Sequence, residues 1–140
     1  MAMPKVLVVV FALLVSAPAA ATDIDVYKDP NCGCCQRWVE HLQANGFSVK
    51  VHDVADFMQY KQGVPSELAA CHTAKVGGYL IEGHVPASDI RRLLKERPKV
   101  SGIAVPGMPA GSPGMEGPRA QRYEVLTFDK DGNTAVFAQH

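Results

Sequence analysis

The chain has 140 residues, in which 14 Lys and Arg balance 14 Asp and Glu. This length suits a single domain, and the zero net charge argues against a nucleic-acid-binding protein and an acidic disordered chain. The sequence contains no internal repeat and so excludes a collagen, a coiled coil and a repeat array. Four Cys, ten Pro and twelve Gly are the unusual counts.

Residues 1–21 have the pattern of a secretory signal peptide. Lys5 precedes an unbroken apolar run over residues 6–15, and residues 19–21, all Ala, fit the small-residue cleavage pattern. A helix of that length spans about 15 Å, half of a bilayer's hydrocarbon core, so the run is too short for a membrane anchor. We expect cleavage of residues 1–21, a mature domain over 22–140 and, in a bacterium, a periplasmic location.

The first half of the mature chain predicts a strand, a helix and a second, parallel strand. Residues 23–28 and 47–54 alternate between polar and apolar side chains, as strands do. Between them, apolar residues fall on one helical face, at Cys35, Trp38, Val39 and Leu42. A C-x-x-C pair at the start of such a helix indicates the front half of a thioredoxin-like domain.

The second half predicts an α/β continuation. We expect short helices over 56–62 and 64–71, a strand over 76–81 and a helix over 86–97, followed by a hairpin of strands 123–128 and 134–138. The expected fold is therefore a thioredoxin-like α/β domain: a mixed sheet with flanking helices and a C-terminal β-hairpin. This hairpin stands where that fold normally has a terminal helix.

Residues 102–118 contain five Gly and four Pro, which exclude a helix and a central strand. The segment is also apolar, with two methionines, so it resembles a packed loop more than a solvated linker. We expect this loop to fold over the cysteines, with Met108 close to their sulfurs.

Three cysteines gather where the first helix begins. Cys32, Cys34 and Cys35 directly follow the first strand, and the partial positive charge of a helix N-terminus favours their thiolates. Cys34 points about 100° away from Cys35 around the helix, so the sulfurs surround the helix end. A third thiol would invite wrong disulfides in a redox pair, whereas a soft metal gains from each added thiolate.

Together with Cys71, these cysteines allow three interpretations. Adjacent thiolates that reach different ions suit a bridged cluster of several Cu(I) ions. A tetrahedral Zn²⁺ site with four Cys ligands is the second, although zinc sites usually space their cysteines by two to four residues. The third is two structural disulfides, since four is an even number in an exported domain.

Histidine and methionine side chains offer further ligands, each with a structural alternative. His72, beside Cys71 at the predicted end of a helix, either joins the cysteines or faces the helix carbonyls. His84 lies at a strand-to-helix junction as a ligand, as a donor to a ligand or as a cap. The thioethers of Met108 and Met115 are soft enough for Cu(I), or they fill gaps beneath the loop.

Three separated motifs resemble the CopG-type copper-resistance family. They are YKDPNCGCC at residues 27–35 followed by Trp38, the segment 77–86 with its GGY and EGHVP, and the segment 105–115 with its VPGMP and GSPGM. The resemblance implies a thioredoxin-like fold, a periplasmic location and copper held by thiolates, with Met108 in the signature loop. The thiolates that it implies are Cys32, Cys34, Cys35 and Cys71.

The sequence therefore favours a periplasmic copper-binding protein of copper tolerance, not an enzyme, that holds Cu(I). One alternative is a thiol–disulfide oxidoreductase that uses Cys32 and Cys35, and another is a disulfide-stapled binding module without metal. Expected partners are copper ions and other periplasmic copper-handling proteins, with no nucleic acid and, once the signal peptide is cleaved, no membrane.

Overall fold

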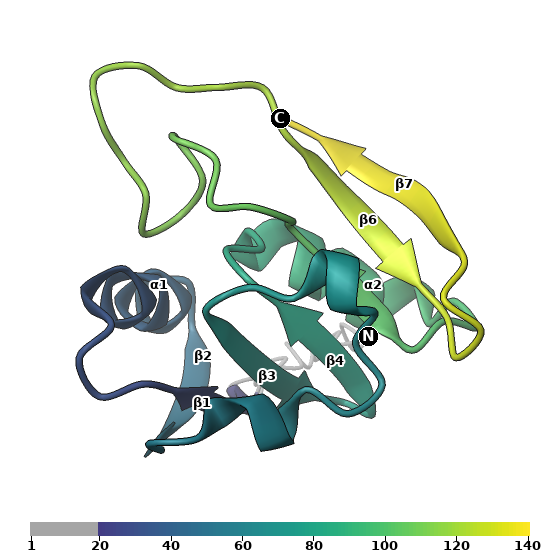
Figure 1. Cartoon of the computed structure of the whole chain (residues 1–140), viewed down its shortest axis with the longest axis horizontal. Coiled ribbons are helices and arrows are strands. Elements are labelled where there is room, and N and C mark those ends of the chain that lie inside the picture. Colours follow the sequence, from purple (N-terminus) through teal and green to yellow (C-terminus); the bar gives the residue numbers. More distant parts are fainter. Residues whose placement is uncertain (1–19) are drawn as a thin grey trace, which may run out of the picture.

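A seven-stranded mixed sheet runs through residues 20–140, the part of the chain that this computed structural model describes. Residues 1–19, most of the expected signal peptide, lie outside the described residues. Within 20–140, two α-helices and two 3₁₀ segments accompany the strands (Figure 1). The elements are β1 (Thr22–Lys28), α1 (Gly33–Ala44), β2 (Phe47–Asp53), η1 (Phe57–Tyr60), η2 (Ser66–Leu68), β3 (His72–Val76), β4 (Tyr79–Glu82), α2 (Ala87–Glu96), β5 (Gly102–Ala104), β6 (Glu124–Phe128) and β7 (Thr134–Gln139).

The predicted strand–helix–strand unit is confirmed. β1 and β2 are parallel, with Ile24 opposite Val49, and α1 connects them. The helix buries the face that its apolar spacing predicts, at Cys35, Trp38, Val39 and Leu42. Trp38, Val39 and Leu42 join Ile24 of β1 in one core, which also receives the buried stripe of α2. Apolar periodicity thus determines how α1 is oriented, and with it where the cysteines at its start point.

The expected single strand over residues 76–81 is wrong. Gly77 and Gly78 both have positive φ, at 55° and 87°, and they form the two-residue turn between the antiparallel strands β3 and β4. Positive φ at both central residues is the requirement of a tight hairpin turn, and Gly-Gly meets it without steric cost. The hairpin places the start of β3 beside the end of β4.

The expected helices over 56–62 and 64–71 are also wrong, because only the 3₁₀ segments η1 and η2 form there. Neither stretch has a repeating apolar face that would hold a full helix against the core. The amide of Ala70 donates to the Glu82 carboxylate at 2.7 Å instead of to a carbonyl one helical turn earlier. Cys71 consequently lies in a bend directly before β3 rather than at a helix end.

The expectation of no central strand within residues 102–118 fails at the first three residues. Gly102–Ala104 forms β5, parallel to β4 and antiparallel to β6. Gly102 makes this possible because a Cβ there would lie 2.0 Å from the Leu80 carbonyl oxygen. The C-terminal hairpin is confirmed as β6 and β7, which extend the sheet beyond β5 (Figure 1).

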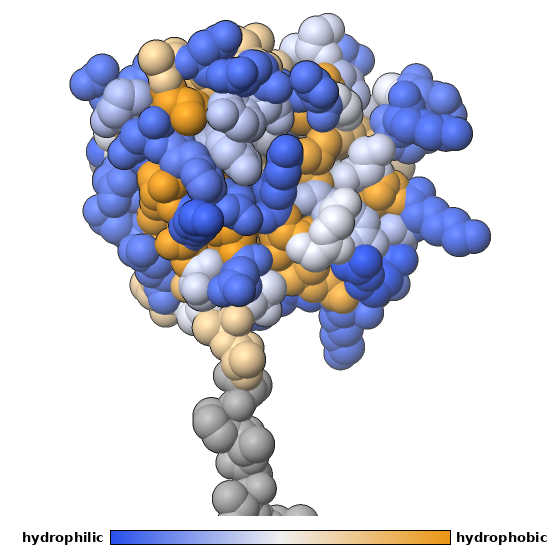
Figure 2. Space-filling model, turned by 90° about the horizontal axis from the view of Figure 1, so that it is seen from below, coloured by the Kyte–Doolittle hydropathy of each residue, from blue (hydrophilic) through white to orange (hydrophobic). Residues whose placement is uncertain are grey.

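The two faces of the sheet bury different side chains. One face carries Ile24, Ala74, Ile81 and Ile103 into the core shared with α1 and α2. The opposite face packs Ala104 and Phe128 against Leu68 of η2. On the side of the molecule seen from below, apolar areas are separated by polar side chains (Figure 2). Within residues 20–140, no helix has the length and apolar character needed to cross a membrane.

We predict that Gly102→Ala lowers the free energy of unfolding by about 3 kcal/mol, the upper end of the usual cost of overpacking, because the backbone of β4 must move. Urea unfolding followed by circular dichroism measures this change. Gly117→Ala is the matched control, since a Cβ at Gly117 meets nothing within 4 Å. Equal unfolding midpoints for the two variants would contradict the close approach of β5 to β4.

Candidate metal centre

The turn after β1 delivers the first cysteines to the start of α1. Cys32 is the N-cap residue, and its Sγ accepts the Cys35 amide N–H at 3.3 Å. Its own amide donates to the Asp29 carbonyl at 3.1 Å, which closes the turn. The orphan amides of a helix N-terminus stabilise negative charge, so this position would favour a thiolate at Cys32 once its sulfur is reduced.

The strand order brings Cys71 to the same place. β3 runs antiparallel to β1, with His72 opposite Lys28, so the beginning of β3 lies beside the end of β1. Ligand atoms of Cys32, Cys34, Cys35 and Cys71 all fall within 4.8 Å of one another. Cys32 and Cys35 form a disulfide, and Cys34 and Cys71 are free thiols. We call these four residues the sulfur cluster.

Two imidazoles approach the sulfur of Cys71 from the other side. His72 Nδ1 and His84 Nε2 each lie 3.4 Å from Cys71 Sγ, and these three residues, the Cys–His set, could also hold a metal ion. His72 Nε2 contacts the Gly83 carbonyl at 2.8 Å, and His84 Nδ1 contacts the Pro113 carbonyl at 2.7 Å. A carbonyl only accepts, so each of these ring nitrogens must carry the proton.

The fixed tautomers have a direct chemical consequence. With one nitrogen of each ring protonated, the other presents a lone pair to Cys71, and one S–H can donate to only one lone pair at a time. Neutral imidazole and thiolate are the forms in which His and Cys bind metals. A metal ion in place of the thiol proton would draw on both imidazoles and the sulfur, so the residues present fit a soft metal.

Burial keeps the metal-free centre uncharged. It lowers the pKa of His72 to about 3, assisted by the neighbouring His84, and it also lowers the pKa of His84. Burial, followed by the nearby Cys34, raises the pKa of the Cys71 thiol to about 12. Both imidazoles are therefore neutral at pH 7, and Cys71 keeps its proton until a cation replaces it.

The aromatic core supports the Cys–His set from within. Trp38, fully buried on α1, stacks on His72 with ring centroids 4.3 Å apart, and His72 meets His84 edge to face at 5.0 Å. The indole N–H of Trp38 donates to the Val85 carbonyl at 2.8 Å, one residue after His84. The two imidazoles are thus held by packing as well as by their carbonyl partners.

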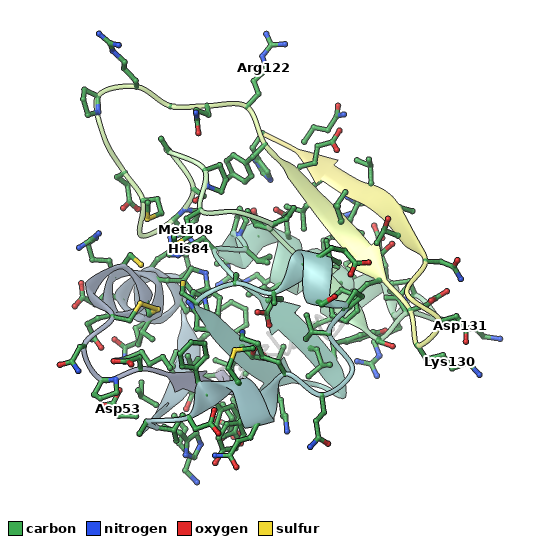
Figure 3. All side chains as sticks on the ribbon, viewed as in Figure 1. Asp53, His84, Met108, Arg122, Lys130 and Asp131 are labelled. Carbon is green, nitrogen blue, oxygen red and sulfur yellow. A yellow bond between two sulfur atoms is a disulfide. The ribbon has the colours of Figure 1, made fainter. Side chains whose placement is uncertain are left out.

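The loop after β5 closes over this centre through residues 112–114, which are buried. Arg37 on α1 donates to the Gly114 carbonyl at 3.0 Å, and a Cβ at Gly114 would lie 2.7 Å from the Cys34 carbonyl oxygen. Met108 is 50% exposed. In the view of Figure 3, Met108 and His84 are labelled next to each other, between α1 and the loop. Contacts of Pro113 with His84 and of Gly114 with Arg37 join the loop to the centre.

The structure brings together Cys32, Cys34, Cys35, Cys71, His72 and His84. The role of Met108 and Met115 as ligands stays a prediction. His72 belongs to β3, not to a helix end, because the expected helix over 64–71 does not form. Sequence reasoning missed the Gly83 and Pro113 carbonyls, which have no side-chain signature.

Comparisons with known proteins agree with this geometry. The family model described as "Protein of unknown function, DUF411" matches residues 68–115. No functionally curated protein matches the chain. Two solved structures, described as copper resistance protein copG in Form 2 and Form 1, are each 48% identical to the chain. Each match covers 86% of this chain and 98% of the other, with TM-scores of 0.81 and 0.80. The chain belongs to the CopG-type family.

The centre of this CopG-type chain has two chemically distinct sides that share one atom. The sulfur cluster presents only sulfur to an ion, whereas the Cys–His set presents two imidazole nitrogens and the same Cys71 sulfur. Thiolates select soft ions such as Cu(I), and imidazole accepts copper in either oxidation state or zinc. An ion in the sulfur cluster and a second ion in the Cys–His set would share Cys71 as a bridging ligand.

We predict that the thiols of the centre titrate in two classes. Unfolded under non-reducing conditions, the protein should show two thiols, Cys34 and Cys71, because Cys32 and Cys35 are joined. After reduction the count should rise to four. Colorimetric thiol titration with peptide mapping measures both values, and a disulfide that includes Cys34 or Cys71 would contradict the pairing.

We predict that Cys71 in the metal-free protein resists alkylation at pH 8. With a pKa of about 12 instead of 9.0, its thiolate fraction falls by roughly 10³, since each pKa unit is a factor of ten. Alkylation by iodoacetamide, quantified by peptide mass spectrometry, should keep accelerating above pH 10, where an ordinary thiol reaches its plateau. A plateau for Cys71 below pH 10 would contradict this prediction.

Proposed function

We propose that this protein binds copper as Cu(I) in the periplasm and takes part in copper tolerance. The observation that carries the proposal is the convergence of four cysteine ligand atoms within 4.8 Å, with two imidazole lone pairs directed at the Cys71 sulfur. The relatives described as copper resistance proteins support the same metal. Copper is the protein's cargo here, and Cys32, Cys34, Cys35 and Cys71 are its proposed principal ligands.

Copper is favoured over zinc by how the ligands are distributed. Cys34 and Cys35 are adjacent, whereas structural zinc sites space paired cysteines by at least two residues. Adjacent thiolates bind separate ions more readily than one tetrahedral ion, which suits sulfur-bridged Cu(I). His72 and His84 complete the proposed set on the buried side. Met108 and Met115 are proposed as thioether ligands that the loop would supply.

The location and fold class extend this proposal. Residues 1–21 are proposed to direct export and then to be removed, which leaves the domain 22–140. We also assign the domain to the thioredoxin-like class. The parallel β1–α1–β2 unit, the antiparallel β3–β4 hairpin and the C-x-x-C pair at the start of α1 support this assignment.

A thiol–disulfide oxidoreductase is the second candidate function. The disulfide between Cys32 and Cys35 favours it, because this is the arrangement that a dithiol oxidoreductase carries at its active helix. Reduction of insulin disulfides by the reduced protein, without uptake of copper, would support this candidate over copper binding. The remaining alternative, a module stapled by two disulfides, requires that Cys34 and Cys71 pair as well.

Copper loading tests the proposed function. We expect the reduced protein to bind Cu(I) in competition with a chromogenic chelator, and more than one ion per chain if Cys71 bridges two positions. Cys71→Ser should lower the number of bound ions, because it removes the shared sulfur. Zn²⁺ should not displace the copper. Metal analysis with thiol counting measures all three results, and absence of Cu(I) binding by fully reduced protein would refute the proposal.

The loop is proposed to shield bound Cu(I), with Met108 as a ligand. We expect Met108→Leu to weaken Cu(I) binding about tenfold and to speed air oxidation of the loaded protein, since Leu keeps the size but lacks the sulfur. Met58→Leu is the matched control, because Met58 on η1 is similarly exposed, at 58% against 50% for Met108. Unchanged affinity in Met108→Leu would remove Met108 from the ligand set.

A further inference from the structure

A buried ion pair lies next to the metal centre, on the opposite face of the sheet. Lys61, which follows η1, and Glu82, the last residue of β4, are 7% and 0% exposed. The Lys61 ammonium contacts Glu82 Oε1 and donates to Thr73 Oγ1 at 2.8 Å. The Thr73 hydroxyl donates to Glu82 Oε2 at 2.6 Å. These three residues form what we call the carboxylate network.

The network reaches the centre through one backbone amide. Glu82 Oε1 also accepts the Ala70 N–H at 2.7 Å, so the residue before Cys71 is tied to β4. On the other side of Cys71, the Gly83 amide donates to the His72 carbonyl at 3.2 Å. Cys71 is therefore fixed on both sides by two consecutive residues, Glu82 at the end of β4 and Gly83 directly after it, although it lies outside the regular pairing of the strands.

Stability alone does not account for such a pair. Two apolar side chains of similar volume usually stabilise a protein as well as a buried ion pair does, because desolvation of the charges offsets their attraction. The Glu82 carboxylate instead fixes the positions of its neighbours, because its two oxygens accept hydrogen bonds from Lys61, Thr73 and Ala70. A metal site depends on this kind of support, because ligands held in place lose less entropy on binding.

We propose that Glu82, held by Lys61 and Thr73, is a positioning residue that fixes the Cys71 sulfur between the two sides of the metal centre. It acts through the Ala70 amide and touches no metal ligand itself. The inference rests on the proposed function, because it assigns the positioning a use in copper binding. The essential feature is an acceptor for the Ala70 N–H, and the negative charge is needed only to match Lys61.

This distinction can be tested with two double variants. Lys61→Met with Glu82→Leu removes both charges and the acceptor, whereas Lys61→Met with Glu82→Gln removes both charges and keeps a carbonyl oxygen for Ala70. In the reduced, metal-free protein we expect the Leu variant to raise the rate of Cys71 alkylation at least fivefold relative to Cys34. The Gln variant should stay within twofold of the wild type.

Copper binding should follow the same order. We expect Cu(I) affinity, measured by chelator competition, to fall about tenfold in the Leu variant and less than twofold in the Gln variant. In a Cys71→Ser background the Leu and Gln variants should bind equally, because the positioned sulfur is absent. Arg92→Met with Glu96→Gln, which removes an exposed pair on α2, is the control and should match the wild type.

Three results would overturn the proposal: wild-type alkylation of Cys71 in the Leu variant, equal impairment of the Leu and Gln variants, or the same loss of affinity in the Cys71→Ser background. If the Leu variant fails to fold, Ala70→Pro removes the N–H donor and leaves the ion pair intact. It should then reproduce the faster alkylation, and a wild-type rate would refute the inference. If the wild type binds no Cu(I), the proposed function fails while the alkylation measurements still test the positioning.

Discussion

Two backbone carbonyls determine the chemistry of this molecule's centre. The oxygens of Gly83 and Pro113 each accept the single proton of a neutral imidazole, so His72 and His84 turn their lone pairs toward one sulfur. The sulfur belongs to Cys71, whose proton can satisfy only one of them. The protein thus has more acceptors than donors at this point, an imbalance that a bound cation would correct.

The rest of the fold serves to bring three distant segments to that point. The antiparallel pairing of β1 with β3 places the start of α1 beside Cys71, and the β3–β4 turn returns the chain to His84. The loop after β5 then supplies the Pro113 carbonyl from more than twenty residues further along. None of these segments forms the centre by itself, so the ligand atoms converge only when the sheet is folded.

The parts of this structure that depend on local patterns could be predicted from the sequence. The face of α1 and the hairpin around Asp131 and Gly132 follow from apolar periodicity and turn chemistry. The clustering of three cysteines follows from their place at a helix start. The dipeptide Gly77-Gly78 is itself typical of tight hairpin turns. The apolar residues on either side of it nevertheless favour a single strand over residues 76–81.

Other parts depend on contacts that no local pattern contains. Gly102 lies in a central strand, where β4 passes too close for any side chain. The Gly- and Pro-rich composition of its segment predicts a loop and gives no sign of this strand. Lys61 and Glu82 are residue types that are normally exposed, and their burial arises only when η1 packs across the sheet. The carbonyls that orient the imidazoles belong to residues with no reactive side chain, so only the folded arrangement reveals them.

Trp38 has a consequence beyond its place in the core. It is the single tryptophan of the chain, and its ring stacks directly on His72. All tryptophan fluorescence of the protein therefore comes from one position, beside the imidazole that faces Cys71. The protein carries an intrinsic optical probe at its centre, through which events at the sulfur can be followed in real time without a label.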